Sequence, residues 1–328
     1  ELPPAFGAGE YQETETREKL LRQTLVNMGF DEAISYSFID TKFDGVFETV
    51  PGLIDENTAE KYITLRDSVI DGAIRMRSTI LSGLLDAVRL NFNHNRRDLK
   101  LFELGKVFAT TRGENPLPNE QESFALVITG GDIDEDRAMP TRELDFYDAK
   151  GAVEAALEAA GIVDLEFETI EAKHLRSGQS ASISVGDGPI GFVGRLSDEI
   201  AATYKLRQPV FLAEVNLQVA MHSPLETPAY RPLTKFPGIV RDVSFVVDRQ
   251  TTFSSVRNEI VEQNYELCRN LMFVDIYEGK GLTEDERSIT VRLGYRSDER
   301  TLIEDEIESL HSQIVAIVEQ KLGIKVRF

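Results

Sequence analysis

The pattern of residues 241–328 restricts the fold more than any other feature of the sequence. Apolar and polar residues alternate over residues 241–248, 271–277, 288–295 and 324–328, and this period of two predicts four strands. Two helical patterns separate them, one over residues 252–262 and one over residues 302–322. The order βαββαβ predicts a ferredoxin-like domain, in which a four-stranded antiparallel sheet carries both helices on one face.

The same alternation predicts which side chains face the helices, because neighbouring residues of a strand point to opposite faces. We expect the mostly aliphatic set against the helices: Val243, Phe245, Val247, Met272, Val274, Ile276, Ile289, Val291, Leu293, Ile324, Val326 and Phe328. We expect the other set on an open face: Asp242, Ser244, Val246, Phe273, Asp275, Tyr277, Thr290, Arg292, Lys325 and Arg327.

An open sheet face with aromatic rings, cations and small polar groups suits two kinds of partner. Rings stack on unpaired bases, cations meet phosphate, and carboxylates or hydroxyls bond to base edges. Aromatic residues also mark surfaces that pack on another protein domain. The residues alone leave both uses open.

The preceding residues, 1–228, predict an α+β domain with a mostly antiparallel sheet. A helix is expected at Arg17–Met28, a half-buried strand at Glu32–Phe38 and a second helix at Thr79–Asn93, followed by further strands without strict βαβ alternation. Prolines at 224, 228, 232 and 237 indicate a linker, since proline interrupts helices and central strands. We therefore expect two domains, residues 1–228 and 229–328.

The charge is unevenly distributed between these domains. The formal net charge is −20, and residues 1–230 hold 22 basic against 39 acidic residues, whereas residues 231–328 hold 14 against 17. The first part should repel nucleic acid, so an RNA contact would need a local patch in the second.

Composition sets the remaining limits. The single cysteine, Cys268, excludes an internal disulfide and fits a reducing cytoplasm, and apolar runs are too short to cross a membrane. A start at Glu1 without methionine predicts a piece of a longer protein. The acidic loop with Asp132, Asp134 and Asp136 has Arg137 where a calcium loop needs glycine. Neither a metal site nor a catalytic residue is predicted in the first domain.

Several motifs make the chain recognisable. Its second domain closely resembles the ferredoxin-fold anticodon-binding domain of the bacterial phenylalanyl-tRNA synthetase β subunit, through Lys235-Phe236-Pro237, Arg241-Asp242, Val274-Asp275-Ile276-Tyr277-Glu278-Gly279-Lys280-Gly281 and Arg300-Thr301-Leu302. Its first domain is similar to the catalytic-like module of that subunit, through Met76-Arg77, Leu81-Ser82-Gly83-Leu84-Leu85, Leu101-Phe102-Glu103-Leu104-Gly105, Asp145-Phe146-Tyr147-Asp148-Ala149-Lys150-Gly151 and Gly178-Gln179-Ser180-Ala181.

The resemblance implies an (αβ)₂ ligase that joins phenylalanine to its tRNA with ATP and Mg²⁺, with the active site in the α subunit. This chain would scaffold α and bind the tRNA(Phe) anticodon region, while editing and metal-binding modules would lie upstream of Glu1. Class II enzymes hold the ATP phosphate with an arginine in a Phe-Arg-x-Glu strand and a second arginine after a glycine-rich strand. Here Leu101-Phe102-Glu103-Leu104 lacks the first, and the second segment is absent. The resemblance thus implies a chain without chemistry or cofactor of its own.

Three readings follow from these features. The first is the β-subunit piece just described, and the second is an inactive class II paralogue that works as a binding or regulatory module without tRNA. The third, an active homodimeric class II ligase, is disfavoured by the missing arginines.

The resemblance and the predicted open face together select the candidate sites. The candidates for RNA binding are Phe236, Arg241, Ser244, Phe273, Asp275, Tyr277, Lys280, Arg292, Arg300, Lys325 and Arg327. In class II enzymes the first helix builds a subunit contact, so the helices at Arg17–Met28 and Thr79–Asn93 are expected at the interface with α. The candidate residues are Leu20, Leu21, Leu25 and Met28. That apolar stripe would equally suit the core.

Overall fold

The computed structural model describes residues 14–55, 57–58, 60–68, 70–112, 117–133, 138–186, 188–222, 230 and 233–327. The chain divides into two compact units, Glu1–Thr227 and Pro228–Phe328, named below the first and the second unit. Pro224, Pro228 and Pro232 of the expected linker, and Asp134 and Asp136 of the acidic loop, lie outside the described residues.

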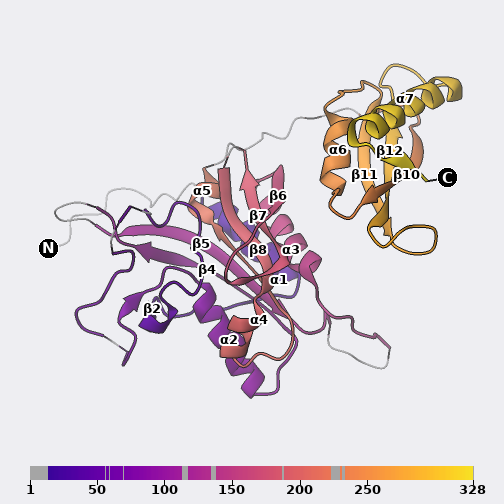
Figure 1. Cartoon of the computed structure of the whole chain (residues 1–328). Coiled ribbons are helices and arrows are strands. Elements are labelled where there is room, and N and C mark those ends of the chain that lie inside the picture. The colour runs from indigo at the N-terminus through magenta and orange to yellow at the C-terminus, as the bar shows by residue number, and fades with distance from the viewer. Residues whose placement is uncertain are drawn as a thin grey trace, which may run out of the picture. The chain divides into compact units, whose positions relative to one another are not determined.

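The first unit is a sheet covered on both faces (Figure 1). Its elements in chain order are α1 (Glu15–Asn27), β1 (Asp31–Glu32), β2 (Phe38–Ile39), a 3-10 turn η1 (Thr41–Phe43), β3 (Arg75–Met76), α2 (Leu81–Asn93), β4 (Leu99–Ala109), β5 (Asn119–Thr129), α3 (Phe146–Ala159), β6 (Leu165–Thr169), β7 (Leu175–Val185), β8 (Gly188–Leu196), α4 (Asp198–Thr203), β9 (Val210–Asn216) and α5 (Leu217–Met221).

Seven of these strands form one sheet in the order β1-β4-β5-β9-β8-β7-β6. The pairing is antiparallel except between β1 and β4, so the predicted α+β class with a mostly antiparallel sheet is confirmed. Apolar residues of α1, α3 and α5 pack on one face, and those of α2 and of the loop with Phe47, Val50 and Leu53 pack on the other.

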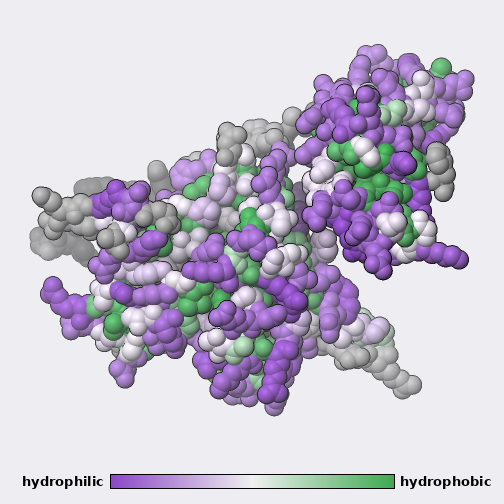
Figure 2. Space-filling model, in the orientation of Figure 1, coloured by the Kyte–Doolittle hydropathy of each residue, from purple (hydrophilic) through white to green (hydrophobic). Residues whose placement is uncertain are grey.

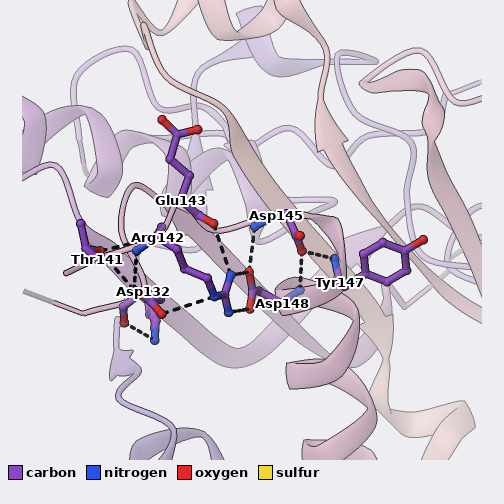
Figure 3. A network of polar contacts seen from close by, with 8 residues as sticks. Asp132, Thr141, Arg142, Glu143, Asp145, Tyr147 and Asp148 are labelled. Atoms are coloured by element: carbon purple, nitrogen blue, oxygen red, sulfur yellow. Dashed lines mark hydrogen bonds and ion pairs between the residues drawn. The ribbon is translucent and has the colours of Figure 1, made fainter. Parts of the chain in front are cut away.

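A polar network fixes α3 to the end of β5. Asp145 caps the helix by accepting from the backbone N–H groups of Tyr147 and Asp148, and the Asp148 carboxylate accepts from the Asp145 N–H. The Arg142 guanidinium lies between Asp148, at 2.6 and 2.8 Å, and Asp132 (Figure 3). Asp132, at the end of β5, is therefore tied through Arg142 to the first turn of α3.

The centre of the sheet buries charged groups. Glu103 and Arg77 form an ion pair of 2.6 Å with both side chains nearly inaccessible, and the Ser35 hydroxyl donates to the same carboxylate at 2.6 Å. Gly105 leaves room for this arginine, because a Cβ there would collide with its guanidinium. A buried pair of this kind is expensive to break from one side, since the other charge would stay buried.

A second buried carboxylate, Glu214 on β9, ties the start of α2 to the sheet. It accepts bonds from the Thr79 hydroxyl at 2.5 Å, the Ile80 N–H at 2.9 Å and the Ser123 hydroxyl at 3.1 Å. Burial nevertheless raises the pKa of Glu214 to about 7, because these hydrogen bonds stabilise the charged carboxylate less well than bulk water does.

The second unit has the expected order of elements: β10 (Ile239–Asp248), α6 (Phe253–Val261), β11 (Cys268–Tyr277), β12 (Glu286–Tyr295), α7 (Glu304–Leu322) and β13 (Lys325–Val326). The strands pair antiparallel in the order β11-β12-β10-β13, which confirms the predicted ferredoxin-like fold. Its core joins the inward residues of β10 and β12 to α6 and α7, with Phe245 and Val291 fully buried.

One predicted strand of the first unit is wrong. Residues 33–37 belong to no strand, and regular pairing is limited to β1 and β2 at either end of the expected Glu32–Phe38 strand. The half-buried positions are those of Ser35 and Ser37, whereas Ile34 and Tyr36 are 93% and 73% exposed. The hydroxyl of Ser35 is drawn inward by the Arg77–Glu103 pair, which turns the apolar residues outward.

The raised pKa of Glu214 predicts a pH-dependent stability that Glu214→Gln removes. The folded carboxyl keeps its proton to a higher pH than the unfolded one, so the wild-type free energy of unfolding should fall as pH rises from 4.5 to about 7. The loss amounts to about 3 kcal/mol at most. Urea unfolding across this range measures it, with the exposed Glu158→Gln as control; identical profiles for wild type and Glu214→Gln would refute the assignment.

Candidate nucleic-acid interface

The face of the second unit's sheet that points away from α6 and α7 carries most of the predicted RNA contacts. We call it the open face and define it by the side chains that share it: Asp242, Ser244, Val246, Met272, Asp275, Tyr277, Ser288, Thr290, Arg292, Lys325 and Arg327. Residues that pair directly across strands lie on the same side, so the register sorts this face into rows.

The first row runs across all four strands. Tyr277 on β11 pairs with Ser288 on β12, Ser288 with Val246 on β10, and Val246 with Lys325 on β13. Neighbouring strands are about 4.8 Å apart, so the long tyrosine and lysine side chains start about 14 Å from each other. This row ends at the β11–β12 turn, where Lys280 is exposed.

The tyrosine of this row is half-covered by an arginine. The Arg327 guanidinium lies over the Tyr277 ring at 4.2 Å from its centroid, a cation–π contact, and the ring remains 37% exposed. The Tyr277 hydroxyl donates to the Lys280 carbonyl at 3.4 Å. Gly279 allows the ring to lie against the turn, since a Cβ there would collide with the phenol oxygen.

The second row carries hydroxyls and one carboxylate. Asp275 pairs with Thr290, and Thr290 pairs with Ser244, with the two hydroxyls bonded at 2.8 Å. The backbone N–H of Arg327 donates to the Ser244 carbonyl at 2.8 Å and extends β13 along this row. Asp275 is exposed, so its carboxylate can accept bonds from a ligand.

The third row is closed by an ion pair. Arg292 pairs with Asp242 across β12 and β10, and its guanidinium donates two bonds of 2.7 Å to that carboxylate. The hydrogen bonds from Arg292 lower the pKa of Asp242, so the carboxylate is charged and cancels the arginine. Met272 lies beside this pair.

Phe273 is not on the open face, and this prediction is corrected. A β-bulge between Phe273 and Asp275 leaves Val274 without a partner position, so the residues before it change sides. Phe273 pairs with the buried Val291 and makes an edge contact with Phe253 of α6, at 5.5 Å between ring centroids. Figure 2 shows apolar surface gathered over β11 and α6. Phe273 itself is half-exposed.

The same bulge moves Met272 from the predicted helix-facing set to the open face. Val274 and Ile276, also predicted to be buried, are 40% and 37% exposed, because β11 is an edge strand. Ile276 follows the bulge and keeps its predicted helix-facing side, opposite the buried Ile289, so the alternation of the sequence fails only for the residues up to the bulge.

Three other candidates belong to the surroundings of the open face and not to the face itself. Arg241 lies on the same side of β10 as Val243, the side that faces the helices, and it forms an ion pair with Glu304 at the start of α7. Arg300 donates bonds of 2.6 and 2.8 Å to Glu306. Phe236 lies in the loop before β10, where its carbonyl accepts from Arg296 at 3.4 Å. Arg241 and Arg300 are thus already neutralised.

The predicted interface of the first unit also needs correction. Leu21 and Leu25 are completely buried in the core that α1 shares with α3, so neither can contact a partner. Leu20 and Met28 of the same stripe are exposed. The apolar stripe of α1 is therefore divided, with one part in the core of its own unit and the other part on the surface.

The sequence analysis missed Ile34 and Tyr36, which add large apolar surface next in the chain to α1. Their alternation with serine predicted only a half-buried strand, without saying which side faces outward. Scattered exposed apolar residues are ordinary, whereas two at this exposure on one short extended segment suit a protein contact. The second predicted interface helix, Thr79–Asn93, is α2, which buries most of its apolar residues in its own unit.

The described residues do not fit a bound metal. Groups of three histidine, cysteine, aspartate or glutamate side chains suited to a metal ion do not occur among them. Glu103, at the position compared above with the class II strand, is buried and held by Arg77. Among the described residues, no helix is long and apolar enough to cross a membrane.

Two family models match the chain. The family model described as "Phenylalanyl tRNA synthetase beta chain CLM domain" matches residues 2–217, and the one described as "Ferredoxin-fold anticodon binding domain" matches residues 234–327.

Similar proteins carry the corresponding names. The phenylalanine–tRNA ligase beta subunit of Geobacter sulfurreducens is 32% identical over 94% of this chain, and that of Listeria innocua is 29% identical over 99%. The chain spans 38% and 40% of these two proteins. A solved structure of a pyrrolysyl-tRNA synthetase from Desulfitobacterium hafniense, 17% identical, covers 62% of this chain with 66% of its own, at a TM-score of 0.46.

Proposed function

The chain belongs to the phenylalanyl-tRNA synthetase β chain family, and on this premise we propose that it is the C-terminal part of a phenylalanine–tRNA ligase β subunit. In this proposal the second unit binds the anticodon region of tRNA(Phe), and the first unit scaffolds the catalytic α subunit in an (αβ)₂ enzyme of the cytoplasm. ATP and Mg²⁺ serve the α subunit, and this chain supplies no catalytic group.

The observation that carries RNA binding is the composition of the open face around Tyr277. An exposed aromatic ring offers a stacking surface to any base. Two residues away on the same strand and face, Asp275 offers an acceptor to base N–H groups, and Ser244 and Thr290 offer hydroxyls in the same row. Unpaired bases of an anticodon loop present the faces and edges that such a surface needs.

The charge distribution supports a loop rather than a duplex as the ligand. The first unit is strongly acidic, so it repels the phosphates of a long helix and favours a contact limited to the second unit. An inactive paralogue without tRNA remains the alternative, and it predicts an open face that RNA does not occupy.

Tyr277→Ala should weaken binding of the chain to an RNA hairpin that carries the tRNA(Phe) anticodon loop. Loss of one stacking ring costs about 1–3 kcal/mol, which is about a tenfold change or more in Kd. Phe273→Ala is the matched control, because it removes a ring from the same strand but from the helix-facing side. Fluorescence anisotropy at fixed salt measures both.

The contrast between the two variants decides the proposal. Tyr277→Ala should lower the affinity while Phe273→Ala leaves it within about twofold of wild type. If Tyr277→Ala binds as wild type does, or if Phe273→Ala alone weakens binding, the open face is not the RNA platform.

The scaffold role rests on the exposed apolar residues of α1 and of the following segment. Leu20 and Met28 on α1, together with Ile34 and Tyr36, present four large side chains to solvent. The inner sides of both elements are fixed, by Leu21 in the core and by Ser35 on Glu103, so the outer sides are presented rigidly. We assign this surface to the contact with the α subunit.

Ile34→Asp with Tyr36→Asp should release the α subunit. Burial of two large apolar side chains contributes about 3 kcal/mol or more. Since about 1.4 kcal/mol is a tenfold change in Kd, the double variant should weaken association about a hundredfold or more. Gel filtration of co-expressed subunits measures the association, and Leu117→Asp, at an exposed leucine outside this segment, is the control. Co-elution of α with the double variant as with wild type would exclude this surface.

A further inference from the structure

β11 (Cys268–Tyr277) is a long edge strand of the second unit's sheet. The strand order places β12 on one side of it, and no strand lies on its other side among the described residues of this unit. The main-chain N–H and C=O groups that point to this outer side take no part in the sheet, so they can pair with another strand. The opposite edge differs, because β13 is only two residues long and carries Lys325, and short charged edges resist such pairing.

The helix-facing side of this edge strand is apolar and incompletely covered. Phe273 and Ile276 pair with buried residues of β12, yet they remain 46% and 37% exposed. Val261, the last residue of α6, is 52% exposed as well, and Figure 2 shows the apolar surface over β11 and α6. A strand added outside β11 would cover these side chains and extend the apolar layer under the helices.

The two charged side chains of β11 have opposite signs and lie symmetrically about Met272. Arg269 precedes this methionine by three residues, and Asp275 follows it by three. Among the described residues, the Asp275 carboxylate has no ion pair or side-chain hydrogen bond, and Arg269 has only a long ion pair of 3.8 Å with the exposed Asp298. Both charged groups are therefore accessible to a strand that docks on this edge.

A second copy of β11 fits this edge in one antiparallel register. A twofold axis through Met272 places Arg269 of each copy opposite Asp275 of the other. The same axis places Leu271 opposite Phe273, and both face the helices. A shift by two residues, the smallest that keeps every side chain on its face, brings Arg269 opposite an aromatic residue instead. Of these registers, the one about Met272 alone joins opposite charges, and it does so twice.

The other charges near this edge weaken the pairing only at its ends. Glu266 and Glu278 lie beyond the two ends of β11 and approach each other in this register, but Arg249 holds the Glu278 carboxylate at 3.0 Å. The net charge of −20 repels two copies at long range, although residues 231–328 contribute little to it, with 14 basic against 17 acidic residues. Salt at physiological concentration screens this repulsion beyond about 8 Å, whereas cross-strand pairs are in direct contact.

We infer that the outer edge of β11 is a docking surface for a second copy of this chain. The second copy adds its own β11 in the antiparallel register about Met272, which joins the two four-stranded sheets into one. The contact is isologous, so every cross-strand pair occurs twice. The inference goes beyond the proposed function and depends neither on RNA binding nor on the contact with the α subunit.

Charge reversal at the two positions tests this register in the full chain. Sedimentation velocity from about 1 to about 100 µM protein, at about 150 mM salt, should show a concentration-dependent dimer of the wild type. Arg269→Asp and Asp275→Arg should each weaken dimerisation about tenfold or more, because each replaces two opposite-charge pairs by two like-charge pairs. Arg269→Asp combined with Asp275→Arg should restore the dimer, since this variant exchanges the charges and keeps the pairs.

Two controls locate the contact. Lys325→Asp makes the same change of charge as Arg269→Asp at the opposite edge of the sheet, and it should leave the dimer unchanged. Ile34→Asp with Tyr36→Asp removes exposed apolar surface from the first unit and should also leave it unchanged. Circular dichroism confirms that the variants are folded.

The outcomes that overturn the inference are distinct from those that test the proposed function. A wild-type chain that stays monomeric over the whole range overturns it. A dimer that Arg269→Asp leaves unchanged, or that the charge-exchanged variant fails to restore, overturns it as well, because β11 would then not pair in this register. A dimer lost in the Ile34/Tyr36 variant would lie on the first unit, which also contradicts it. None of these results changes the expected effect of Tyr277→Ala on RNA binding.

Discussion

The β-bulge between Phe273 and Asp275 decides what the second unit can bind. By adding Val274 to one strand without a partner on the other, it places Phe273 against α6 and leaves Asp275 and Tyr277 on the open face. A continuous ladder would have put two aromatic rings and no methionine on that face. The bulge thus leaves Tyr277 as the one aromatic ring among the described residues of that face, with hydroxyls and a carboxylate in the next row.

In the first unit, buried polar groups shape the outer surface. The Arg77–Glu103 pair draws Ser35 inward, and Gly83 allows this approach, since a Cβ there would collide with the serine side chain. Ile34 and Tyr36 are outward for that reason. The closed Arg77–Glu103 pair thereby fixes the segment that exposes Ile34 and Tyr36.

The sequence predicted the order of elements in the second unit because its strands and helices have long, unbroken periods. It failed at Phe273, because a bulge exchanges the two faces for the residues before it, and no residue type in the sequence marks the position of the bulge. It placed Leu21 and Leu25 at an interface because a helical stripe looks the same whether its own chain or a partner covers it. At Ile34 and Tyr36 the alternation left the inward side undecided, because a buried ion pair 40 or more positions away in the chain determines which side faces inward.

Methyl resonances that report on one face of the sheet test the central claim most directly. Met272, Val246 and Thr290 carry methyl groups on the open face, whereas Ile276 and Val261 lie on the side of the helices. On titration of the methyl-labelled chain with the anticodon hairpin, the open-face methyl signals should shift with saturating binding while those of Ile276 and Val261 stay in place. Shifts confined to Ile276, Val261 and their neighbours on α6 would contradict the account and place the RNA on the opposite surface.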